Sequence, residues 1–237
     1  MSDPKSPNKS NLKYSIMACL ENGNRLILDA EMLELSNPPS TAYALIIIAQ
    51  EEFAKAFLLT LVYKDIIQWN RLILRATRDH VCKQLLSMVM DYIYPDDDEF
   101  FKRIESWPKR ENLDSLPSHI ADALNILYHE KIRRWESQNW AWAEPPNYDS
   151  TAKRVAKGKI DKIKQDQLYV DIGNEGSVIP KIAITSKQFE LEKERSERLC
   201  NLVRGMINKD EAGSIDFDNV IKSIKILFPQ TQNAPNK

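Results

Sequence analysis

The sequence has little glycine, cysteine and histidine for its length. Only 6 glycines, 3 cysteines and 3 histidines occur among 237 residues. So few glycines, together with few apolar–polar alternations of the kind that mark half-buried strands, predict an all-α fold. The cysteines Cys19, Cys82 and Cys200 have neither CxxC spacing nor the density of a disulfide framework. This use of cysteine favours a reducing compartment, and we expect a cytoplasmic protein.

The chain also lacks a strong net charge and a membrane-spanning segment. Its formal net charge is −1 and 43% of its residues are hydrophobic, which is typical of a globular protein and leaves nucleic-acid binding to a local basic patch. The most apolar run, Ala44–Val62, is interrupted by Glu51, Glu52 and Lys55, so it is too polar to cross a bilayer. The first ten residues are polar and contain proline, so they do not resemble a signal peptide. We therefore expect no association with a membrane.

Several common catalytic motifs are absent as well. The sequence has no P-loop, no GxGxxG and no GxSxG, which leaves nucleotide-binding folds and serine hydrolases without support. The segment YHEKIRRW begins like the HExxH zinc motif, but Arg133 stands where the second histidine is required. We accordingly predict neither a cofactor nor a bound metal.

The pattern of apolar residues predicts one helical domain over residues 11–228, between disordered ends at residues 1–10 and 229–237. Proline and charge clusters mark residues 95–158 as an insertion or lobe on this domain. The expected helices cover residues 11–35, 40–68, 71–94, 119–137, 186–207 and 217–228. Leu168–Ile172 reads as a short strand followed by a glycine turn and another extended piece, which predicts a short β-hairpin-like element near the C-terminus.

Charged residues stand at the centre of the most apolar helix, in the segment AQEEFAKAFLL (residues 49–59). On a helical wheel Glu52 falls on the apolar stripe, with Glu51 and Lys55 beside it. We therefore expect Glu52 to be the buried carboxylate. A buried carboxylate needs a partner, so these residues form either an internal ion pair of Glu52 with Lys55 or a polar cluster that serves function.

A second polar segment, RATRDHVCK (residues 75–83), combines arginine, histidine and lysine. A histidine near cationic groups suits RNA cleavage by the 2′-hydroxyl, because imidazole transfers protons near neutral pH and guanidinium binds phosphate. In an unbroken helix Arg75 and His80 would lie 140° apart, so they meet only if the helix begins near Thr77 or if a second subunit completes the site. The alternative is a capped, partly exposed histidine among solvated charges.

Two further segments, LYHEKIRRW (residues 127–135) and residues 153–164, are rich in lysine and arginine. Either can follow a phosphate backbone, although most lysine-rich segments are ordinary surface. Trp135, Trp140 and Trp142 either pack within the insertion or form a binding surface.

Three segments in this order, AQEEFAKAFLL, DHVCK and KQDQLYVD, resemble the V-type abortive-infection proteins (AbiV), a branch of the HEPN superfamily. The resemblance covers about residues 12 to 207. It implies an all-helical HEPN bundle that acts in bacterial defence against phage, commonly as a homodimer. Many HEPN proteins are metal-independent ribonucleases that use an Arg-x4–6-His motif across the dimer interface.

By this resemblance Arg75 and His80 are the expected catalytic pair. We hypothesise that Glu52 orients His80 or fixes Lys55, and that Lys55 and Lys83 approach the phosphate of the RNA. The family motifs also include residues to which we assign no role: Glu51, Asp79, Lys164, Tyr169 and Asp171.

The function that follows is a growth-arresting ribonuclease, toxic to its host and active in infection, with RNA as substrate and a phage-encoded protein as a candidate activator. The alternative is a non-catalytic HEPN scaffold that binds RNA or a phage or host protein.

Overall fold

The computed structural model describes residues 7–33, 38–106, 116–135, 146–179, 182–208 and 215–228. Most of the two predicted disordered ends, and the predicted roles of Trp140 and Trp142, therefore fall outside the described residues. Within those ranges the ordered secondary structure is helical, which confirms the predicted all-α class.

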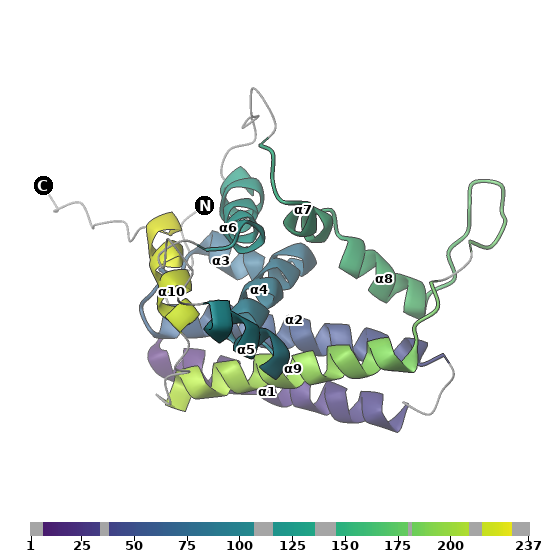
Figure 1. The fold of residues 1–237 in the computed structure, drawn as a ribbon, viewed down its shortest axis with the longest axis horizontal. Coiled ribbons are helices and arrows are strands. Elements are labelled where there is room, and N and C mark those ends of the chain that lie inside the picture. Colours follow the sequence, from purple (N-terminus) through teal and green to yellow (C-terminus); the bar gives the residue numbers. More distant parts are fainter. Residues whose placement is uncertain are drawn as a thin grey trace, which may run out of the picture.

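Three long helices form the base of the bundle: α1 (Lys9–Met32), α2 (Ser40–Tyr63) and α9 (Ser186–Asn208). They lie side by side in Figure 1. Helix α2 is central, because it packs against α1 and α9 and also against α4 (His80–Ile93) and α8 (Lys159–Leu168). Its side chains are buried on almost every face, as expected of a helix surrounded by others.

The contact between α1 and α2 depends on a glycine. A Cβ added to Gly23 would lie 2.3 Å from an edge carbon of the Phe53 ring, and Phe53 is 0% exposed. Gly23 therefore lets the aromatic ring of α2 lie directly on the backbone of α1.

Shorter helices complete the bundle, and several of them pack against α4 (Figure 1). They are α3 (Arg71–Ala76), α5 (Asp97–Ser106), α6 (Ser118–Asn125), α7 (Ser150–Ala156) and α10 (Ile215–Leu227). Helix α6 continues into a π-helical stretch, η2 (Ile126–Ile132), and a 3-10 turn, η3 (Arg133–Trp135). The helices α6 and α7, which belong to the predicted insertion, both pack against α4.

The predicted helix over residues 71–94 is wrong at one place, because residues 77–79 separate α3 from α4. The Asp79 side chain accepts a hydrogen bond of 2.8 Å from the backbone N–H of Cys82 and so begins α4. The break places His80 in the first turn of α4.

The predicted β-hairpin-like element is also wrong. Helix α8 extends to Leu168, the first residue of the predicted strand. Residues 168–179, which were expected to form the hairpin, contain no strand. One isolated antiparallel bridge joins Ile172 to Val178 around the turn. Figure 1 shows this segment projecting from the bundle beyond α8. Two short extended pieces without a third strand or a helix to cover them are marginal in water, which explains why pairing stops at one bridge.

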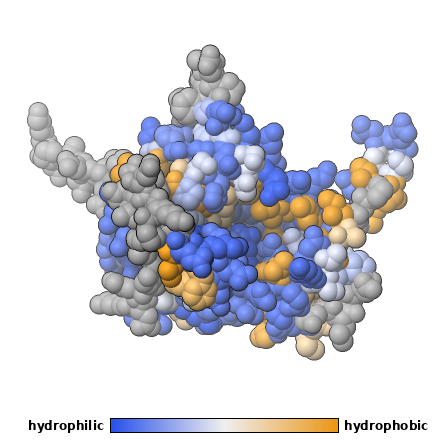
Figure 2. Space-filling view, in the orientation of Figure 1, coloured by the Kyte–Doolittle hydropathy of each residue, from blue (hydrophilic) through white to orange (hydrophobic). Residues whose placement is uncertain are grey.

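The cysteines and the long apolar helices also bear on what was expected from the sequence. The three cysteines are buried and unpaired. Among the described helices, none combines the length and apolar character needed to cross a membrane. Figure 2 shows a largely hydrophilic face, with hydrophobic residues gathered near α8 and the segment that follows it.

Candidate functional site

The centre of the site is the carboxylate of Glu51, whose side chain is 3% exposed. Its Oε2 lies 2.6 Å from Nδ1 of His80 and 3.0 Å from Nζ of Lys83, both on α4. Its Oε1 accepts a hydrogen bond of 2.8 Å from Nζ of Lys164 on α8 and one of 3.2 Å from Nε2 of Gln84 on α4. We call Glu51, His80, Lys83, Gln84, Lys164 and the neighbouring Asp161 the Glu51 cluster.

The charges of the Glu51 cluster balance within the bundle. Nζ of Lys164 lies 2.6 Å from Oδ1 of Asp161, one helical turn earlier on α8. Burial alone raises the pKa of Glu51, but the ammonium groups of Lys83 and Lys164 outweigh it and the pKa is lowered. Burial opposes the charge of Lys164 in the same way, but its bonds to Asp161 and Glu51 raise its pKa. Glu51 and Lys164 are therefore both charged near neutral pH and form an ion pair.

The geometry fixes the tautomer of His80. An ionised Glu51 offers only acceptors, so a 2.6 Å contact requires a proton on Nδ1. Lys164 Nζ lies 3.2 Å from the same nitrogen, and it could donate only to an unprotonated Nδ1. That tautomer would turn a ring lone pair towards the Glu51 carboxylate at 2.6 Å, so the shorter contact places the proton on Nδ1. The nitrogen that can accept or release a proton is consequently Nε2. The His80 side chain is 52% exposed, so the ring combines a buried anchor with access from solvent.

The buried carboxylate on α2 is Glu51, whereas the sequence pattern predicted Glu52. Glu52 is only partly buried and pairs with Lys55 at 2.6 Å, while Glu51 is 2% exposed and reaches His80. The Glu52–Lys55 pair faces α1, where Cys19 lies; burial, with Glu52 adding to it, raises the pKa of the Cys19 thiol to about 11. The residue that contacts and orients His80 is therefore Glu51 and not Glu52. The helical wheel led to the wrong glutamate because α2 is buried on nearly every side, so its apolar stripe does not distinguish Glu51 from Glu52.

Within one chain the guanidinium of Arg75 contacts the insertion. The guanidinium carbon is 4.3 Å from the centroid of the Trp135 ring, a cation–π contact. Among the described residues no hydrogen bond or ion pair joins Arg75 to His80.

The remaining motif residues have different positions. Asp79 caps α4 and so sets the position of His80. Tyr169 and Asp171 are exposed in the segment after α8 and lie outside the cluster. Gln84 and Asp161 were not predicted as site residues from the sequence. The available signals were weak: Gln84 follows His80 by four residues, and Asp161 precedes Lys164 by three, spacings that place side chains on one helix face.

A metal ion fits this arrangement poorly. Ligand atoms of Glu51, His80 and Asp161 all lie within 4.8 Å of one another, as a metal site would need. The ammonium groups of Lys83 and Lys164, however, already contact the carboxylate oxygens of Glu51. A divalent cation would meet two positive charges at its own ligands, so the donor set does not favour one.

The all-helical bundle agrees with the fold that the resemblance to HEPN proteins implies. The family model HEPN_AbiV, described as AbiV, matches residues 11–201. The chain therefore belongs to the AbiV family of the HEPN superfamily, and is an abortive-infection protein of anti-phage defence. No curated protein and no solved structure matches the chain.

Proposed function

We propose that the protein is a metal-independent endoribonuclease that cleaves RNA during phage infection, with His80 as its general acid and base. The observation that carries the proposal is the 2.6 Å contact between Nδ1 of His80 and the buried carboxylate of Glu51. It orients the imidazole and leaves Nε2 for proton transfer.

In this reaction Nε2 of His80 takes the proton of a ribose 2′-hydroxyl, whose oxygen attacks the adjacent phosphorus. The bond from phosphorus to the 5′-oxygen breaks, and the leaving 5′-oxygen takes the proton from Nε2 of His80, which gives a 2′,3′-cyclic phosphate and a 5′-hydroxyl end. The positive charge that His80 gains is stabilised by Glu51, because the carboxylate already faces the protonated Nδ1. Lys83 and Lys164 have side chains only 7% exposed, so they maintain the ionised Glu51 rather than contact phosphate directly.

The proposal includes a homodimer in which a second copy supplies the arginine. Support comes from Arg75, which in one chain contacts Trp135 and not His80. Mixing inactive Arg75→Ala and His80→Ala proteins tests this. A site built from two chains regains activity in the mixed dimer, because one site then has both residues. A site built within one chain stays inactive.

The principal test uses purified protein with RNA in the presence of EDTA, followed by a denaturing gel. Wild type should cleave, and both His80→Ala and His80→Asn should not. His80→Asn is the more informative variant, because its amide N–H can still donate to Glu51 and so preserves the Glu51 cluster. It removes only the group that transfers protons. His129→Ala removes a histidine outside the Glu51 cluster and should keep activity.

The competing function is a scaffold that binds RNA or a phage or host protein without cleaving it. Two results would support this function. RNA incubated with the wild-type protein stays intact even when extract from phage-infected cells supplies any phage-encoded activator. The His80→Asn variant also protects a culture from phage as well as the wild-type protein does. Loss of protection in His80→Asn, at unchanged melting temperature, supports the catalytic role.

A further inference from the structure

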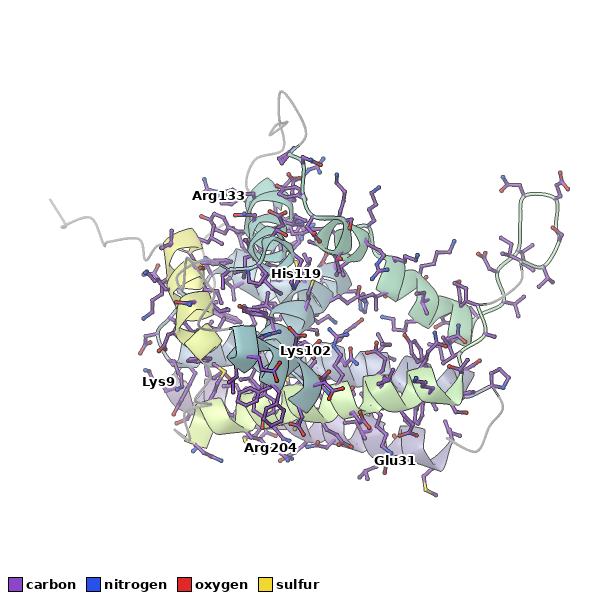
Figure 3. The ribbon with its side chains drawn as sticks, viewed as in Figure 1. Lys9, Glu31, Lys102, His119, Arg133 and Arg204 are labelled. Carbon is purple, nitrogen blue, oxygen red and sulfur yellow. The ribbon has the colours of Figure 1, made fainter. Side chains whose placement is uncertain are left out.

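The two basic segments of the sequence converge on one groove. A groove of about 280 Å³ lies between η2 and α7. Lys131 and Arg134 line it from the first basic segment, and Lys153 and Lys157 line it from the second. Figure 3 labels Arg133, which follows η2 in the part of the molecule that carries the groove. We call these four cations and their walls the η2–α7 groove.

The cations of the η2–α7 groove have no carboxylate partners among the described residues, whereas Lys83 and Lys164 share Glu51. One carboxylate, Glu130, lines the groove, and it accepts a hydrogen bond of 3.3 Å from the hydroxyl of Tyr148. Lys131 and Lys153 are partly buried rather than extended into solvent. Four positive charges facing one negative charge in a small concavity repel one another, so the groove is suited to a polyanion.

The η2–α7 groove adjoins the Glu51 cluster. Lys157 is followed by Gly158, where an added Cβ would lie 3.9 Å from Val81, the residue next to His80. One turn further along α8, Asp161 Oδ1 is 4.0 Å from Nδ1 of His80. On its other side, the groove residue Arg134 precedes Trp135, the ring that Arg75 covers. The groove therefore lies beside the first turn of α4, which carries His80.

The size and walls of the groove indicate a single strand. Its volume lies just below the roughly 300–1,000 Å³ typical of small-molecule sites, which suits one backbone unit and not a duplex. Tyr148 and Pro146 in the walls, with Trp135 nearby, offer flat apolar surfaces beside the cations. Cationic grooves edged by aromatic rings bind the phosphates and the unpaired bases of single strands.

We infer that the η2–α7 groove binds the phosphodiester backbone of single-stranded RNA and leads it to His80. This inference rests on the proposed ribonuclease function, which it deepens by placing the substrate strand on the insertion that carries η2.

The test measures binding separately from cleavage. A fluorescent single-stranded RNA of twelve nucleotides is titrated in EDTA with His80→Asn protein, which keeps the RNA intact, and anisotropy is followed at several salt concentrations. Adding Lys153→Glu and Lys157→Glu should weaken binding by about tenfold or more and reduce the salt slope by about 1.4, since each phosphate contact to a single strand contributes about 0.7. Lys13→Glu with Lys187→Glu, on exposed positions of α1 and α9, makes the same change in net charge and should leave binding nearly unchanged.

The outcomes separate this inference from the proposed function. Equal losses in the groove and control variants would show a nonspecific charge effect and overturn the groove assignment. Equal affinity for a duplex of the same length would overturn the single-strand assignment. If wild type cleaves RNA while the groove variant binds as tightly as its parent, the ribonuclease proposal stands and the groove inference fails. Groove-dependent binding without cleavage by wild type would support the groove and reject the ribonuclease.

Discussion

Replacing Glu51 by glutamine should be among the most damaging single changes in this protein. The substitution keeps the shape of the side chain but removes the charge that Lys83 and Lys164 share. Lys164 retains Asp161 at 2.6 Å. The Lys83 side chain is 7% exposed, and among the described residues it forms an ion pair with Glu51 alone. Lys83 would therefore be left buried without a compensating charge.

The size of the effect follows from the burial of the ion pair. Breaking a buried ion pair by removing one partner costs about 3–5 kcal/mol, because the other charge stays buried without compensation. We therefore expect Glu51→Gln to lower the free energy of unfolding by about 3–5 kcal/mol.

Glu52→Gln is the matched control, because it makes the same chemical change one residue away. Its pair with Lys55 has side chains 14% and 27% exposed, and we expect a loss of about 1 kcal/mol or less. Urea unfolding followed by circular dichroism measures both. Adding Lys83→Met to Glu51→Gln should recover part of the loss, since the uncompensated charge is then removed. Equal costs for the two glutamates, or no recovery with Lys83→Met, would refute the conclusion that Glu51 is the buried carboxylate that holds the cluster.

Two further predictions concern packing and pH. Gly23→Ala should destabilise by about 1–2 kcal/mol in urea unfolding, because the clash with the buried Phe53 ring outweighs the gain of about 1 kcal/mol in helix propensity, and Ser15→Ala on the exposed face of α1 should stay within about 0.5 kcal/mol. Glu51 has a lowered pKa in the folded state, so its contribution to stability is present above the ordinary value of 4.5 and is lost as the pH falls through the lowered value. Wild type should therefore lose more unfolding free energy than Glu51→Gln between pH 6 and pH 3, and parallel pH curves for the two proteins would contradict this assignment.

The long helices could be predicted from the sequence with small errors at their ends. α9 was expected at residues 186–207 and covers Ser186–Asn208, because its apolar residues recur at helical spacing between polar ones. The break after α3 was missed, although Asp79 is a residue type that often caps a helix. The hairpin prediction failed because local strand propensity at Leu168–Ile172 had no neighbouring strand to pair with, and α8 continued through Leu168 instead.

What the sequence by itself determined is the class and the family: few glycines and helical periodicity give an all-α protein, and the ordered motifs lead to AbiV. It also placed a histidine and charged residues in the right helices. Only the tertiary structure decided which glutamate holds His80, because α2 is buried on nearly all sides and its neighbours come from distant segments. Lys164 reaches Glu51 across 113 residues of sequence, and Lys131 meets Lys153 in one groove through the packing of η2 and α7. Helical periodicity describes one helix at a time, whereas the pairing of buried charges depends on which helices meet.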